Sequence, residues 1–285
     1  MTRNRRLAAV LLSGALAALC HAQTPPRKAQ SMVQRLPFGS LPDGTAVHLY
    51  NLTNGNGMQA RIITYGGAVV SLTAPDKSGK FADVVLGLDN LKDYQASTAH
   101  LGGLIGRYGN RIGKAKFTLD GKLYQLARND GENSLHGGKV GFDARVWTAK
   151  EASGPEGPSI ELTLVSKDGD ENFPGTLNAK AVYTLTDKNE LKIDYTATTD
   201  KPTVVNLTNH AYFNLAGAGD VLGHQVRIDA ARFTPVDRGL IPTGELKPVA
   251  GTPFDFTKLT AIGARIGQAS DQQIKLGNGT TTTGC

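Results

Sequence analysis

A period-two alternation of apolar and polar residues recurs along most of this chain, and it narrows the choice of fold more than any other property of the sequence. Ala115–Leu119 and Lys122–Leu126 flank Asp120-Gly121, which is the tight turn of a predicted β-hairpin. Residues 179–185 and 191–197 alternate in the same way on either side of a second turn. The pattern predicts further strands at residues 46–52, 58–65, 83–88, 159–166 and 224–229.

Helical periodicity is scarce, and only residues 91–95 and 259–266 are expected to form helices, both of them short. Many strands, regular turns and few helices predict an all-β fold, a large antiparallel β-sandwich. Since no repeat or linker interrupts residues 35–279, we expect one domain there, preceded by a flexible lead-in over residues 23–34. Residues 271–279 read as strand and turn.

The first 22 residues have the layout of a secretory signal peptide. Arg3, Arg5 and Arg6 precede the apolar run Leu7–Leu19, and the segment ends on the small residue Ala22. Cleavage there predicts a periplasmic or secreted protein with no membrane-spanning segment in the mature chain. A buried N-terminal helix is the alternative; a lipid anchor on Cys20 would require a small residue where Leu19 stands.

Charge and cysteine content exclude several function classes. The formal net charge is +6, and removal of the three leader arginines leaves 6 − 3 = +3, too small to indicate a nucleic-acid partner. The two cysteines are Cys20, in the leader, and Cys285, the last residue. The mature chain therefore has neither an internal disulfide nor a cysteine zinc cluster.

The segment Asn206–Leu215 is the strongest candidate for a binding surface. As one extended strand it would direct five hydrogen-bonding side chains to one face and a mostly apolar set to the other. His210 lies in the middle of the polar row and can exchange a proton near neutral pH. Such a face is suited to a hydroxyl-rich ligand such as a sugar. The polar row comprises Asn206, Thr208, His210, Tyr212 and Asn214, and the other face Leu207, Asn209, Ala211, Phe213 and Leu215.

Two further segments could carry chemistry. Residues 106–112, with the sequence GRYGNRI, offer arginine donors to sugar oxygens, or else are solvated loop residues. Residues 131–138, GENSLHGG, place glycines around His136 and so allow a ligand to approach the backbone, although a loop histidine without a task fits equally well. His210 could itself be a satisfied, half-buried histidine. No metal site is predicted, because no close histidine pair or acidic-histidine motif occurs among His48, His100, His136, His210 and His224.

Together these segments resemble the aldose 1-epimerase (galactose mutarotase) family. The resemblance runs from about Phe38 to Gly279. It implies a sandwich whose concave face binds an aldohexose, galactose or glucose, and interconverts its α- and β-anomers without a cofactor. The motifs that carry it are GRYGNRI, GENSLHGG, DGDENFPG at residues 168–175, NLTNHAYFNL at residues 206–215 and TPVDRGLIPTGE at residues 234–245.

The resemblance also implies the roles of individual residues. His210 would be the general acid that protonates the ring oxygen, and His136 would lie close to that oxygen and help to place the sugar. Asn110, Arg111 and Tyr212 would line the substrate site. Ring opening needs this acid together with a base that removes the proton of the anomeric hydroxyl.

The base is where this sequence departs from the family pattern. Family members continue past the Gly279 region with a sugar-binding aspartate and then a catalytic glutamate, whereas threonines follow here. We therefore expect a sequence truncated or frame-shifted after Gly279, with an aberrant tail at residues 280–285, missing C-terminal strands and no catalytic base. A carbohydrate-binding module that keeps the fold without catalysis is the alternative. The sequence leaves the oligomeric state open.

Overall fold

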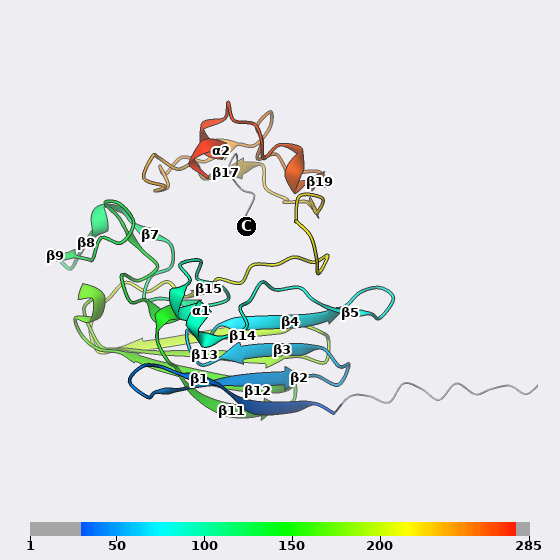
Figure 1. Cartoon of the computed structure of the whole chain (residues 1–285). Helices are drawn as coiled ribbons and strands as arrows, with labels where there is room; N and C mark the ends of the chain where they lie inside the picture. Colours follow the sequence, from blue (N-terminus) through cyan, green and yellow to red (C-terminus); the bar gives the residue numbers. More distant parts are fainter. Residues whose placement is uncertain (1–29, 278–285) are drawn as a thin grey trace, which may run out of the picture.

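Two antiparallel sheets form the body of the protein in the computed structural model, which describes residues 30–277. The predicted signal peptide, most of the lead-in and the threonine-rich tail lie outside these residues. One sheet has five strands in chain order, and the other has four (Figure 1). The first comprises β1 (Met32–Ser40), β2 (Ala46–Thr53), β3 (Gln59–Ile63), β4 (Val69–Pro75) and β5 (Phe81–Asp83). The second comprises β11 (Thr148–Gly154), β12 (Gly157–Ser166), β13 (Leu177–Leu185) and β14 (Leu191–Thr199).

The two sheets share one hydrophobic core. Leu52 and Ile62 of the first sheet belong to the same buried cluster as Ile160, Leu162 and Ala181 of the second, and each of these side chains is almost completely excluded from solvent. Burial of alternate residues on facing strands is what holds two sheets together. The prediction of an all-β antiparallel sandwich is confirmed.

Shorter elements sit around the sandwich. Figure 1 shows the part with β17, β19 and α2 above the sheets, α1 and β15 beside the sheets, and β7 to the upper left with β8 and β9. The helices are α1 (Leu91–Ala96) and α2 (Gln272–Leu276), and 3-10 turns occur at Gly113–Ala115, Phe142–Ala144, Asp170–Asn172 and Ile262–Ala264. The short strands are β6 (Leu104–Ile105), β7 (Arg111–Ile112), β8 (Lys116–Leu119), β9 (Lys122–Gln125), β10 (Ser134–Leu135), β15 (Thr208–Asn209), β16 (Gln225–Val226), β17 (Arg232–Phe233), β18 (Lys247–Pro248) and β19 (Thr260–Ala261).

Most predicted strands are present, but of residues 83–88 only Asp83 belongs to a strand, β5, and residues 224–229 contain only the two-residue strand β16. The hairpin across Asp120-Gly121 forms as β8 and β9, and the alternating pair at residues 179–185 and 191–197 forms as β13 and β14. Among the longer strands the structure adds β1, β4 and β11, which the pattern did not indicate, and β1 starts at Met32, inside the predicted lead-in.

Three further predictions of local structure were wrong. Residues 206–215 form a two-residue strand, β15, and isolated bridges instead of one continuous strand, because their backbone groups bond in turn to several different segments. Residues 272–276 are helical where strand and turn were expected, since the Asp271 side chain accepts hydrogen bonds from the first backbone N–H groups and caps a helix. Residues 259–266 contain only β19 and a 3-10 turn.

Within residues 30–277, no helix has the length and apolar character that crossing a membrane requires.

Candidate active site

Three imidazole rings meet beside the sandwich, and they come from segments far apart in the sequence. The ring centroids of His136 and His210 are 5.2 Å apart. His100 lies 4.8 Å from His136 and 5.7 Å from His210 by the same measure. Two of the three were predicted site residues, and the structure places them in contact. We call this group the imidazole cluster.

Backbone hydrogen bonds on both sides of His210 fix its position. Its N–H donates to the carbonyl of Gly103 at 2.9 Å, and its carbonyl accepts from the N–H of Gly102 at 3.0 Å. The preceding residue, Asn209, donates from Nδ2 to the carbonyl of Gly102 and to the hydroxyl of the fully buried Tyr183. Asn209, the polar residue on the otherwise apolar face, is therefore the anchor of this segment.

His136 is held by a reciprocal pair of hydrogen bonds with Asn110. The N–H of His136 donates to the Asn110 carbonyl at 3.1 Å, and the N–H of Asn110 donates to His136 Nδ1 at 3.0 Å. A backbone N–H can only donate, so Nδ1 accepts and the ring proton resides on Nε2. Burial, then the neighbouring His100 and His210, lower the pKa of His136 to about 4. At neutral pH His136 is thus an uncharged ring that offers one N–H donor.

Two glycines after His136 let its loop pack closely against other backbone. A Cβ on Gly137 would lie 1.9 Å from the carbonyl oxygen of Gly106, and one on Gly138 would lie 2.2 Å from the Glu171 carboxylate. That carboxylate accepts hydrogen bonds from the N–H groups of Lys139 and Val140. The space beside these glycines was predicted to admit a ligand, but other parts of the protein fill it. Glu171 holds the loop after His136, and we call residues 168–175, which contain it, the clamp.

The two arginines of residues 106–112 have different tasks. Arg111 lies on β7, where its Nε donates to Asp130 at 2.7 Å and its Nη1 to Asn110 at 3.3 Å, so its guanidinium is oriented beside the predicted site residues. Arg107 is only 2% exposed, and it donates to Ser166 and to the carbonyls of residues 166, 167, 174 and 175. Arg107 is thus neither a sugar ligand nor a solvated loop residue. It connects residues 106–112 to the clamp.

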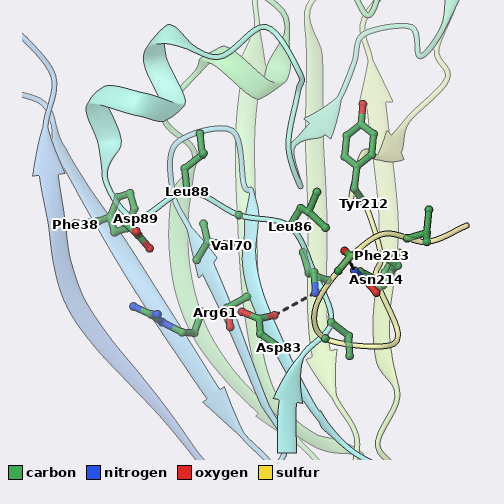
Figure 2. A pocket seen from close by; sticks show the side chains of 17 residues that line it. Phe38, Arg61, Val70, Asp83, Leu86, Leu88, Asp89, Tyr212, Phe213 and Asn214 are labelled. Atoms are coloured by element: carbon green, nitrogen blue, oxygen red, sulfur yellow. Dashed lines mark hydrogen bonds between the residues drawn. The ribbon is translucent and has the colours of Figure 1, made fainter. Parts of the chain in front are cut away.

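Tyr212 stands next to the cluster, with its ring centroid 5.0 Å from that of His210. It also borders a cavity of about 600 Å³ that Arg61 and Asp83 line from the first sheet. Figure 2 shows the Tyr212 ring directed away from Asp83, while Phe213 and Asn214 lie between them. The described histidines of the cluster do not line this cavity.

The predicted alternation of faces fails beyond Tyr212. Asn214 is only 8% exposed, and its Nδ2 donates to the carbonyl of Gly219, whereas Phe213 and Leu215 are 52% and 73% exposed. Because β15 ends at Asn209 and Phe213 pairs only through an isolated bridge with Val85, side chains no longer alternate between two fixed faces. Asn214 therefore stabilises a turn and is not part of a polar row with His210.

His100 and Asp143 are members of the site that sequence reasoning missed. His100 Nδ1 and Asp143 Oδ2 are 2.6 Å apart, and both side chains are largely buried. His100 precedes Gly102-Gly103, the two residues that bind the backbone of His210, but nothing in its spacing from the other histidines indicated this proximity. Burial lowers the pKa of His210, as does His100, whereas its own backbone hydrogen bond and Asp143 raise it.

Three residues at this site have a strained backbone. His100, Asn110 and His136 have φ values of 55°, 62° and 52°, in the left-handed region that non-glycine residues rarely adopt. Each such residue costs on the order of 1 kcal/mol, which the surrounding hydrogen bonds must offset. Three strained residues in one cluster are typical of a functional site.

The cluster can hold and transfer protons next to hydrogen-bond donors. His210 titrates, His136 donates from Nε2, and Arg111 adds a fixed cation. Among residues 30–277, no group of three or more histidine, cysteine or acidic side chains is arranged to hold a metal ion. The arrangement is suited to an uncharged polar ligand that gains and loses protons.

Comparison with known proteins identifies relatives that match most of the chain. The family model described as aldose 1-epimerase matches residues 48–282. A galactose mutarotase from Sus scrofa is 45% identical over 237 residues, which cover 82% of this chain and 68% of that protein. An aldose 1-epimerase from Escherichia coli (strain K12) is 42% identical over 82% of this chain and 67% of that protein. The crystal structure of a galactose 1-epimerase from Lactobacillus acidophilus NCFM superimposes with a TM-score of 0.78 at 31% identity, covering 87% of this chain and 72% of that one.

Proposed function

Because the chain belongs to the aldose 1-epimerase family, we propose that it acts on an aldohexose, galactose or glucose, and interconverts its α- and β-anomers. The observation that carries this proposal is the contact between His136 and His210, with ring centroids 5.2 Å apart, beside Asn110 and Arg111. A proton-donating imidazole next to several fixed N–H donors suits a cyclic hemiacetal, which has one ring oxygen and many hydroxyls.

In the proposed reaction, His210 protonates the ring oxygen as the bond between that oxygen and the anomeric carbon breaks. His136 donates a hydrogen bond from Nε2 to the same oxygen, and Arg111 and Asn110 bind hydroxyls. The open aldehyde turns about its first carbon–carbon bond and closes on the other face, and His210 then recovers its proton. Tyr212 borders the site beside His210.

The forward step also needs a base for the anomeric hydroxyl, and we propose that this chain does not supply it. Asp143 and Asp130, the carboxylates next to the site, are bonded to His100 and Arg111. Residues 1–29 and 278–285 contain no aspartate or glutamate. The acidic residues after the His210 segment make local contacts of their own: Asp220, Asp229, Asp237, Glu245, Asp255 and Asp271.

Polarimetry on freshly dissolved α-galactose tests this proposal. The 285-residue chain should change the optical rotation little faster than its His210→Ala variant does, because an acid without a base completes only half of the proton transfer. His48→Gln, which alters a histidine outside the cluster, is the control. Robust mutarotation that requires His210 and not His48 would refute the missing base.

If the chain catalyses mutarotation slowly, titration calorimetry with galactose distinguishes a chain that lacks only the base from one that lacks the sugar site. Heat of binding with little turnover indicates that the sugar site is intact and only the base is absent, which is how a carbohydrate-binding module would behave. No binding at all would contradict the proposed site. We also infer export to the periplasm or the medium from the predicted signal peptide at residues 1–22.

A further inference from the structure

The contact between His100 and Asp143 has no part in the proposed reaction, yet it is the shortest side-chain contact of the imidazole cluster. An ionised carboxylate only accepts hydrogen bonds, so His100 donates from Nδ1 to Asp143 Oδ2 across 2.6 Å. This bond fixes both the plane of the His100 ring and the nitrogen that carries its proton, as a carboxylate does for other histidines.

Asp143 is itself rigidly placed. It belongs to the 3-10 turn at Phe142–Ala144, whose Phe142 is buried in the sandwich core. A Cβ on Gly103 would lie 2.8 Å from the Asp143 Cβ, and one on Gly141 would lie 2.7 Å from its Oδ1. Two glycines therefore leave room for this side chain and confine it.

His100 contacts both histidines of the proposed reaction. Its ring meets that of His136 at an interplanar angle of 72°, edge to face, and that of His210 at 41°. The residues that follow it, Gly102 and Gly103, bind the backbone of His210. A change at His100 would thus reach both rings directly.

We propose that His100 and Asp143 are a positioning pair for the reaction proposed above: Asp143 fixes the ring of His100, and His100 fixes the rings and the proton occupancy of His136 and His210. The pair has a distinctive electrostatic signature. His100 lowers the pKa of both His136 and His210, whereas Asp143 raises both. The two members of one hydrogen-bonded pair therefore act on the site in opposite directions.

The other ionisable groups around the cluster are the same in each variant described below, so they do not account for a difference between variants. Arg111 on β7 lowers the pKa of His136, and Tyr212 contacts His210. Tyr65 and Lys139 line, with His100 and Asp143, a cavity of about 400 Å³. Burial and Asp143 raise the pKa of Tyr65, so this hydroxyl stays protonated wherever histidines titrate.

The test is a pH titration of the full chain with ¹⁵N-labelled histidine, followed by long-range ¹H–¹⁵N NMR without any sugar. Asp143→Asn keeps the side-chain shape and removes the charge, and it should lower the pKa of His136 and His210 by a few tenths of a pH unit or more. His100→Asn, which tolerates the left-handed backbone, should raise both. Asp194→Asn, which removes one carboxylate from an exposed ion pair on β14, is the control for net charge.

Asp143→Asn is the decisive variant. Burial is the largest cause of the lowered pKa at both histidines, so a substitution that merely loosened the site would let water in and raise the two values. A fall in the pKa of His136 and His210 that exceeds the change in Asp194→Asn supports the positioning pair. A rise, or a change no larger than in Asp194→Asn, would overturn it. Since no sugar is present, this result is independent of whether the chain catalyses mutarotation.

Discussion

The chemistry at the residue scale depends on which nitrogen of each histidine carries a proton. His136 accepts the Asn110 N–H at Nδ1, and its pKa is lowered to about 4, so it is neutral and donates from Nε2. The pKa of His210 is lowered as well, first by burial, and in the proposed reaction this is the ring that gives up a proton. The proposed reaction thus assigns different roles to two neighbouring imidazoles, and their surroundings are what would separate these roles.

The lowered pKa of His136 predicts a specific acid sensitivity. Between pH 6.5, the ordinary value, and about pH 4, the unfolded chain binds a proton at this residue that the folded chain does not. Folding stability should therefore fall as the pH drops through that range, by about 2 kcal/mol between pH 7 and pH 5 from this residue. His136→Asn tolerates the backbone and removes the group, so its unfolding free energy in urea should fall less over the same range. Equal losses in both proteins would contradict this account.

Sequence reasoning found four of the residues that meet at the site, but it missed His100 and Asp143. His136, His210, Asn110 and Arg111 are brought together as expected. Arg107 could not be separated from Arg111, because its partners are mainly backbone carbonyls, which every sequence has. The sequence position of Asp143 carries no sign of His100, since the two meet only when their segments pack.

At the scale of elements, the site is a set of loops held by a polar clamp. Glu171 accepts two N–H groups of the loop after His136, and Arg145 donates both to Asp170 and to the Val140 carbonyl. Arg107, within residues 106–112, donates to the carbonyls of Pro174 and Gly175 in the same clamp. Loop residues thereby acquire the fixed geometry that proton transfer needs.

Glycine-to-alanine substitution measures this close packing. Gly131 and Gly137 both have left-handed φ, 58° and 91°, but a Cβ on Gly131 meets no atom within 4 Å, and one on Gly137 lies 1.9 Å from a carbonyl oxygen. Gly131→Ala should cost about 1 kcal/mol from backbone strain alone. Gly137→Ala should cost more than about 3 kcal/mol in denaturant unfolding, or prevent folding. Similar costs would show that the loop yields easily and that the clamp does not fix His136.

The same scale shows why local pattern predicted some elements and failed on others. β8 and β9 pair with each other across a tight turn, so their alternation was sufficient. Residues 206–215 pair in turn with residue 108, with β6 and with residue 85. A strand that changes partner loses its regular faces, and only the packed fold determines where that happens.

At the scale of the whole molecule, the sandwich is a rigid support that carries the site on its margin. Tyr183 shows the connection: it is fully buried between the sheets, its hydroxyl donates to the Gly67 carbonyl, and it receives a hydrogen bond from Asn209 beside His210. The core therefore positions the segment that holds the proposed acid. We propose that this margin binds an aldohexose at His136 and His210.

Titration of galactose into the ¹⁵N-histidine-labelled chain, followed by NMR, is the direct test of this binding, because the resonances report on the two rings whether or not turnover occurs. We expect saturable changes in the resonances of His136 and His210, none at His48 on β2, and weaker binding in Arg111→Ala. Resonances of His136 and His210 that stay unchanged, or that move no more than those of His48, would contradict the account.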